Sequence, residues 1–216
     1  MPHIIKIDQQ NLYKDTVDII TKLISKGKTF VYPTETFYAI GALYDDETSI
    51  NKIFDIKWRD LNNPLPLIIP EISFLQKISI EVSTNAIKLA TQFWPGPLTL
   101  IFKAADNLSR SITAGTGTVA CRHSGLNVIS VILKNINSSI TSTSANISGR
   151  ENASNILEIN KSILHNVDFI IDAGKTNGGL PSTIIDVTSE PFKILRKGAI
   201  DSSLILDYCS RITEHK

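Results

Sequence analysis

The sequence is poor in the residues that build metal and redox centres. Its 216 residues include two cysteines and four histidines. None of them has the spacing of a zinc site or of a redox-active cysteine pair. We therefore expect no metal site made by the protein, and isolated cysteines are typical of a reduced, cytoplasmic interior, where we place the protein.

Long apolar segments and a dominant sign of charge are also missing. No stretch is apolar and uncharged for the length of a membrane span, and residues 1–10 carry acid and amide side chains where a signal peptide is apolar. Lys and Arg number 22 against 21 Asp and Glu, which gives a net charge of +1. An anion site must then come from a local concentration of cations.

The common nucleotide-binding motifs do not explain the sequence. It contains no G-x-x-x-x-G-K-[ST], which excludes a P-loop. GTGTVA from Gly115 matches the dinucleotide fingerprint in letters, but it leads into a predicted strand rather than a helix. A serine-hydrolase elbow is absent too.

Short β-rich runs alternate with helical patterns along the whole chain, which indicates an α/β fold. We predict one domain over 1–216, with its core at about 27–199 and no separate C-terminal domain. Expected helices are 15–26 closed by Gly27, one capped by Thr48, one capped by Ser83, 127–136, 155–163 and 202–209. Expected strands begin at Thr29, Leu65, Leu98, Thr118, Ser139, Asp168, Ser182 and Phe192. The segment 172–181 is predicted to be a mobile loop beside a site.

Two cations stand close together in KWRDLNNPLPLII. Pro64 and Pro66 favour extended backbone, in which Lys57 and Arg59 would share one side. An ammonium beside a guanidinium fork suits phosphate groups. The alternative is a solvated helix end with two surface cations.

Hydroxyl and amide side chains gather in two further motifs. TSTSANISG brings Ser144 and Asn146 two positions apart after a predicted strand, and PTETFYAIG follows another strand from Pro33. Such groups at strand ends suit a small polar ligand, although they also serve as backbone caps. Arg122 and Arg196, two of only six arginines, lie in or beside strands as well.

Read in order, seven motifs resemble those of the threonylcarbamoyl-AMP synthase family, the YrdC-like proteins. They are PTETFYAIG, Lys57-x-Arg59 with Asn63-Pro-Leu, WPGPLTL from Trp94, TVACR from Thr118, TSANISG from Thr143, PSTIID from Pro181 and LRKGAI from Leu195. Single motifs are weak, but seven in this order and spacing are specific. The resemblance implies the short form of the family, with a strongly twisted, mixed open sheet flanked by helices around a wide cationic cavity.

The resemblance also implies an activity and its residues. The enzyme would form threonylcarbamoyl-AMP and pyrophosphate from ATP, L-threonine and bicarbonate, as a nucleotidyltransferase that supplies tRNA modification. L-Threonine would contact Thr36, Arg122, Ser144 and Ser182. ATP would contact Lys57, Arg59, Asn63, Thr118, Asn146, Ser154 and Arg196, with Lys57 and Arg59 as catalytic cations. Mg²⁺ would arrive on the ATP phosphates, and tRNA threonylcarbamoyl-transfer proteins would receive the product, with RNA as a further contact.

Some positions depart from the family pattern. Ile68 stands where a histidine is common, Ala39 where glycine is usual, and Asp60 and Ser124 where prolines are expected. The cationic and hydroxyl groups remain. Two alternatives are an RNA-binding module that uses the basic concave surface, which the low net charge disfavours, and a relative of the hydrogenase-maturation carbamoyltransferases, whose zinc-finger segments this sequence lacks.

Overall fold

The computed structural model describes residues 2–147 and 149–214, so Ser148 of the TSANISG motif lies outside the described residues. The helices are α1 (Lys14–Ser25), α2 (Glu47–Lys57), α3 (Leu75–Ile78), α4 (Thr84–Phe93), α5 (Arg110–Thr113), α6 (Asn127–Ile136), α7 (Lys161–Asn166) and α8 (Ser202–Glu214), with 3₁₀ turns at Ile72–Phe74 and Ile156–Glu158. The strands are β1 (His3–Lys6), β2 (Phe30–Tyr32), β3 (Ala39–Gly41), β4 (Leu67–Ile68), β5 (Ser79–Glu81), β6 (Leu98–Ala104), β7 (Thr118–Arg122), β8 (Ile140–Thr141), β9 (Thr143–Ser144), β10 (Phe169–Asp172), β11 (Thr183–Asp186) and β12 (Lys193–Arg196).

The strands form two mixed sheets, whereas the family resemblance implied one. A five-stranded sheet has the order β1-β10-β2-β3-β9, and a seven-stranded sheet has the order β12-β11-β6-β7-β4-β8, with β5 beside β6. Both contain parallel and antiparallel pairs. The predicted α/β class and mixed strand order are therefore confirmed.

The segment predicted as one strand from Ser139 is shared between the two sheets. β8 pairs with β4 in the seven-stranded sheet, whereas β9, two residues later, pairs with β3 in the five-stranded sheet. Ser142 between them donates its backbone N–H to the Pro66 carbonyl at 2.7 Å. The chain therefore changes sheets within five residues, and this crossing brings the two sheets together.

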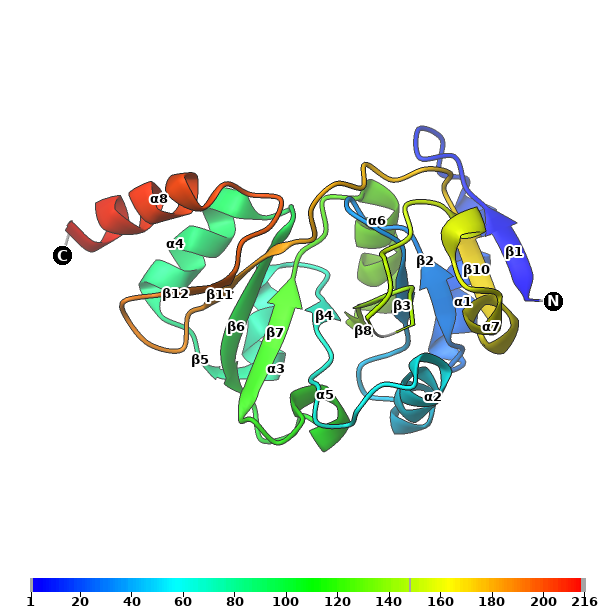
Figure 1. Ribbon diagram of the computed structural model, residues 1–216, viewed down its shortest axis with the longest axis horizontal. Coiled ribbons are helices and arrows are strands. Elements are labelled where there is room, and N and C mark those ends of the chain that lie inside the picture. Colours follow the sequence, from blue (N-terminus) through cyan, green and yellow to red (C-terminus); the bar gives the residue numbers. More distant parts are fainter. Residues whose placement is uncertain (1, 148, 215–216) are drawn as a thin grey trace.

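Helices cover both sheets (Figure 1). α1 and α6 pack against each other over one face of the five-stranded sheet, and α2 and α7 pack over the other face. α4 and α8 pack together beside the seven-stranded sheet. β1 and α8 lie at opposite ends of the molecule, while β4 and β8 lie between the two groups of helices (Figure 1).

Local signals placed several helix ends correctly. Gly27, just past α1, has a φ of 68°, the left-handed conformation that glycine adopts without strain. The Ser83 hydroxyl accepts from the backbone N–H of Ala86 at 3.1 Å and caps α4. The predicted Thr48 cap of α2 is wrong, because Asp46 accepts from the backbone N–H of Ser49 at 3.2 Å.

The helix predicted over 155–163 is also wrong in its extent. A 3₁₀ turn and the short α7 replace it, and each has its own asparagine cap. Asn155 accepts from the backbone N–H of Leu157 at 2.9 Å, and Asn160 accepts from that of Ser162 at 2.8 Å. Asparagine is more favourable at such caps than in helix interiors, so two short helical segments begin here in place of one long helix.

Candidate functional site

A cavity of about 230 Å³ opens where the two sheets meet. Its walls come from the turn between β2 and β3, from the crossing at Ser142, and from β4, β6, β7, β11 and β12. Six predicted site residues line it: Thr36, Arg59, Arg122, Ser144, Ser182 and Arg196. The sequence motifs, far apart along the chain, thus converge on one space.

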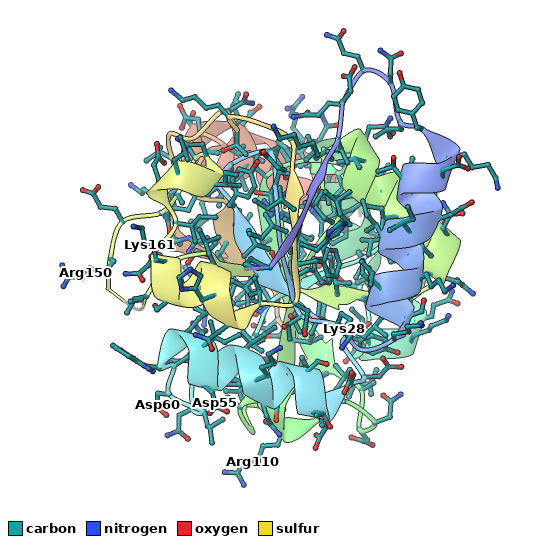
Figure 2. All side chains as sticks on the ribbon, turned by 90° about the vertical axis from the view of Figure 1, so that its right-hand side faces the viewer. Lys28, Asp55, Asp60, Arg110, Arg150 and Lys161 are labelled. Carbon is teal, nitrogen blue, oxygen red and sulfur yellow. The ribbon has the colours of Figure 1, made fainter. Side chains whose placement is uncertain are left out.

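Three arginines face this cavity. Burial lowers the pKa of Arg59 and Arg196, and the charge of Arg122 adds to the lowering at Arg196. On the face of the molecule in Figure 2, by contrast, charges of both signs are interspersed. At the end of the molecule seen in Figure 2, the labelled cations Lys28, Arg110, Arg150 and Lys161 share the surface with Asp55 and Asp60. The concentration of cations at the cavity is what an anionic ligand needs.

Arg122 is held by a carboxylate. It ends β7, and its Nη1 lies 3.1 Å from Oε1 of Glu35, with side chains 7% and 14% exposed. The other oxygen of Glu35 accepts from the Ser124 hydroxyl at 2.8 Å. Glu35 thereby uses both carboxylate oxygens, whereas Arg122 gives one N–H to it.

Arg196 is held by Ser182, the residue before β11. Its Nε and Nη2 donate to the carbonyl of Ser182 at 3.0 and 2.8 Å, and Nη2 also reaches the Ser182 hydroxyl at 3.0 Å. That hydroxyl shares a hydrogen bond of 2.8 Å with Thr99 Oγ1. Gly198 permits this packing, because a Cβ there would lie 2.2 Å from the Pro181 carbonyl oxygen.

Lys57 does not line the cavity, and the prediction of extended backbone at Lys57 is wrong. Lys57 ends helix α2, and Trp58 turns the chain out of the helix with a φ of 51°. The Lys57 side chain is 1% exposed. Its Nζ donates to the backbone carbonyl of Ser144, to that of Asn146 at 2.7 Å, and to Asn146 Oδ1 at 3.4 Å.

This environment lowers the pKa of Lys57 to about 7, mainly through burial and further through the charge of Arg59. Carbonyl oxygens accept its hydrogen bonds but supply no negative charge. Lys57 therefore holds the loop that carries Ser144 and Asn146. Because its pKa lies near neutral pH, both its protonated and its neutral form are populated there. Arg59 itself donates to the carbonyl of Pro64 at 2.9 Å.

The remaining predicted ATP contacts lie outside the cavity wall. Thr118 is at the opposite end of β7 from Arg122, and its hydroxyl bonds that of Thr116 at 2.8 Å. Ser154 donates its hydroxyl to Glu158 at 3.0 Å, and Asn63 offers its carbonyl to Arg59 Nε at 3.4 Å. Asn146 sits behind Ser144, on Lys57. Their roles with ATP stay predictions.

Comparison with known proteins shows which family the chain belongs to. Residues 22–198 match the family model Sua5_yciO_yrdC, described as "Telomere recombination".

The chain belongs to the Sua5/YciO/YrdC family.

Two relatives and one solved structure show how far this likeness extends. A threonylcarbamoyl-AMP synthase of Pyrococcus abyssi is 35% identical over 85% of this chain, which spans 54% of that relative's length. A putative threonylcarbamoyl-AMP synthase of Methanocaldococcus jannaschii is 33% identical over 87% of both chains. The crystal structure of P. abyssi Sua5 complexed with L-threonine superposes with a TM-score of 0.89 at 31% identity, over 96% of this chain and 60% of that one.

The YrdC-like fold is therefore confirmed, and the chain spans about half the length of the P. abyssi synthase that it matches. The single domain over 1–216, with its core at about 27–199, stays a prediction.

Several cavity residues of this family member were not named from the sequence. Thr34, Thr99, Ser142 and Asn152 line the cavity, and Glu35 holds Arg122. Four of these five residues lie in the motifs PTETFYAIG, WPGPLTL and TSTSANISG, so membership of a motif was the sequence signal that could have found them. Ile68, at the position where the resemblance favours histidine, gives the wall an apolar side chain.

The loop 172–181 lines the cavity with Pro181 and also packs on Thr36. The Thr176 hydroxyl and the Gly178 backbone N–H both donate to the Thr36 carbonyl, at 2.8 and 2.9 Å. Tyr38 donates its O–H to the Gly174 carbonyl at 2.7 Å, and burial raises its pKa to about 12. The loop thus packs against the turn that carries a predicted threonine contact.

Proposed function

We propose that this chain is a threonylcarbamoyl-AMP synthase, which joins L-threonine, bicarbonate and ATP into threonylcarbamoyl-AMP and releases pyrophosphate. The observation that carries the proposal is the cavity. Three arginines and several hydroxyls converge there, in a family whose P. abyssi member forms a complex with L-threonine. Cations match the phosphates and carboxylate of the substrates, and hydroxyls match the amino acid's polar groups.

Arg122 suits the threonine carboxylate because a guanidinium presents several N–H groups in one plane and stays charged. Thr36, Ser144 and Ser182 surround the same space and offer hydroxyls to the amino acid. Arg59 and Arg196 remain for the phosphates of ATP. Lys57 would reach a phosphate only by leaving the carbonyls of Ser144 and Asn146, or it would act through the loop that it holds.

The chemistry requires positioning more than a protein nucleophile. The threonine amine adds to CO₂ derived from bicarbonate, loses a proton and becomes a carbamate. A carbamate oxygen then attacks the α-phosphorus of ATP, the bond to the β-phosphate oxygen breaks, and pyrophosphate leaves. Fixed cations stabilise the negative charge that is redistributed in this step, and holding both substrates in one cavity lowers the entropic cost.

Mg²⁺ is assigned to the nucleotide in this proposal. Arginines, hydroxyls and amides line the cavity, and within residues 2–147 and 149–214 no three His, Cys, Asp or Glu side chains are grouped as a metal site. Such a donor set does not make a Mg²⁺ cage, so no protein ligand is assigned to the ion.

The product is a mixed anhydride and needs an acceptor. We propose that the acceptor is an adenosine of tRNA, and that separate transfer proteins move the threonylcarbamoyl group to it in the cytoplasm. Within the described residues no helix has the length and apolar character of a membrane span.

Purified protein tests the proposal directly. With ATP, Mg²⁺, L-threonine and bicarbonate it should release pyrophosphate and form adenylated threonine carbamate, without tRNA. Omission of threonine or bicarbonate should stop the release, because the carbamate is the nucleophile. Serine should react less well, since a missing methyl is worth about 1–3 kcal/mol in an apolar contact. No pyrophosphate with every substrate present, together with tight RNA binding at physiological salt, would favour the RNA-binding module instead.

A further inference from the structure

Glu35 and Ser124 form a buried support behind Arg122. The Glu35 carboxylate lies between the two, with Oε1 3.1 Å from Arg122 Nη1 and Oε2 2.8 Å from the Ser124 hydroxyl. Ser124 is 1% exposed and Arg122 is 6% exposed. Water therefore competes weakly for these hydrogen bonds, and they restrict the movement of the Arg122 guanidinium.

Both ends of this support are themselves held. The Ser124 hydroxyl accepts from the backbone N–H of Leu126 at 3.2 Å, and its carbonyl accepts from the Ser130 hydroxyl at 3.2 Å, so the start of α6 fixes Ser124. Glu35 stands in a turn closed by Thr34, whose hydroxyl accepts from the backbone N–H of Thr36 at 3.2 Å. Neither Glu35 nor Ser124 is therefore a free surface side chain.

The support also links the two sheets. Glu35 follows β2 of the five-stranded sheet, whereas Arg122 ends β7 of the seven-stranded sheet. Glu35 takes one N–H of Arg122 and is not among the residues that line the cavity, whereas Arg122 lines it. The remaining N–H groups of Arg122 make no hydrogen bond to any described residue, so they are available to a ligand carboxylate.

We infer that Glu35 and Ser124 are positioning residues, which orient Arg122 to receive the carboxylate of the amino-acid substrate. This inference rests on the proposed function for the identity of that substrate. Glu35 does not touch the substrate in this arrangement, and Ser124 acts only through Glu35. An ion pair that served stability alone would leave carboxylate recognition unchanged when Ser124 is altered.

The test compares L-threonine with L-threoninamide, which lacks the carboxylate charge. Calorimetry gives both dissociation constants for the wild-type chain, Ser124→Ala and Glu35→Asp. Both variants keep the negative charge, but the first removes a hydrogen bond and the second shortens the carboxylate arm. The ratio of the two constants, threoninamide over threonine, should fall about 3- to 10-fold in each variant, the effect of one hydrogen bond.

Ser79→Ala is the matched control. It also removes a hydrogen bond of a buried serine hydroxyl, to the Leu75 carbonyl at 2.7 Å, but Ser79 does not line the cavity. Its ratio should equal that of the wild-type chain, and Michaelis constants for ATP should stay unchanged in all three variants. Melting temperatures confirm that each variant is folded, and Ser124→Ala carries the test if the shorter Glu35→Asp side chain unfolds the turn.

The outcomes separate the inference from the proposed function. An unchanged ratio in Ser124→Ala, with threonine bound by the wild-type chain, overturns the positioning role alone. Threonine binding without pyrophosphate release overturns the proposed function, while the ratio still decides the positioning role. A wild-type chain that binds no threonine overturns both.

Discussion

Two buried basic side chains near the cavity, Arg122 and Lys57, have different surroundings. Arg122, at the end of β7, faces the carboxylate of Glu35 at 3.1 Å. Lys57, at the end of α2, faces the carbonyls of Ser144 and Asn146, which carry only partial charges. Burial accordingly lowers the pKa of Lys57 to about 7.

The difference separates a permanent charge from an adjustable one. Arginine stays protonated at any physiological pH, so Arg122 with Glu35 is a fixed recognition element. Lys57 can gain or lose its proton near neutrality, and a nearby phosphate would favour the protonated form. In the proposed function, Arg122 would thus hold a constant charge for the amino acid, while the loop held by Lys57 could respond to the nucleotide.

Removal of Arg122 should have the largest effect. Arg122→Met leaves the Glu35 carboxylate buried without its counter-charge, and breaking a buried pair in this way costs about 3–5 kcal/mol of unfolding free energy. Denaturant unfolding measures this loss. The double variant Arg122→Met/Glu35→Gln should recover part of it, because no unpaired charge remains.

Lys14→Met is the control for that experiment. It breaks the exposed pair with Asp18, whose side chains are 88% and 53% exposed, and pairs of this kind contribute about 0–1 kcal/mol. Equal losses for Arg122→Met and Lys14→Met would remove the distinction between the two pairs.

Lys57 should have the next largest effect, on activity. Lys57→Met should lower turnover about 10²–10³-fold, the range for loss of a charged contact or of the loop that it holds. Lys52→Met changes another lysine of α2, which pairs with Asp168 at 2.8 Å on the surface, and should keep nearly full turnover. Steady-state pyrophosphate release measures both variants.

The pKa of Lys57 also predicts a pH dependence. It is lowered from 10.5 to about 7, so between these values the unfolded chain binds the proton and the folded chain does not. The unfolding free energy should therefore rise with pH across this window, and Lys57→Met should reduce the slope. A wild-type slope in Lys57→Met would contradict the assignment.

If phosphate raises the pKa of Lys57, ATP binding at pH 8 takes up a proton, which calorimetry in buffers of different ionisation enthalpy detects.

Smaller effects are expected at Ser144 and Asn146. The Ser144 hydroxyl donates to Asn146 Oδ1, and Asn146 Nδ2 donates to the Arg150 carbonyl. Ala variants should lose about one hydrogen bond of ligand affinity, roughly 1 kcal/mol, with little change in melting temperature. Caps without a ligand role would give the reverse pattern, a lower melting temperature and unchanged affinity.

Much of the fold and of the site follows from local signals in the sequence. Gly27 and Ser83 mark helix ends by their own backbone chemistry, and the motifs found Thr36, Arg122 and Ser182 on the cavity wall. Periodicity carries no information about the partner of a strand. The change of sheet at Ser142 depends on Pro66, which is 76 residues away, so the two sheets were not predicted.

Lys57 and Glu35 show the same limit at single residues. The prolines after Arg59 favour extended backbone but do not control the last turn of α2, which ends at Lys57 itself. Glu35 was part of a quoted motif, yet its partner Arg122 lies 87 residues along the chain. Contacts across such separations come from packing rather than from spacing.

The central claim is that threonine and ATP share the cavity between the two sheets. A crystal structure of the chain with L-threonine and ATP bound tests it most directly. We predict the threonine carboxylate on Arg122, opposite the Nη1 side held by Glu35, and the phosphates between Arg59 and Arg196. Threonine bound outside the cavity, or a carboxylate that leaves Arg122 uncontacted, would contradict the account.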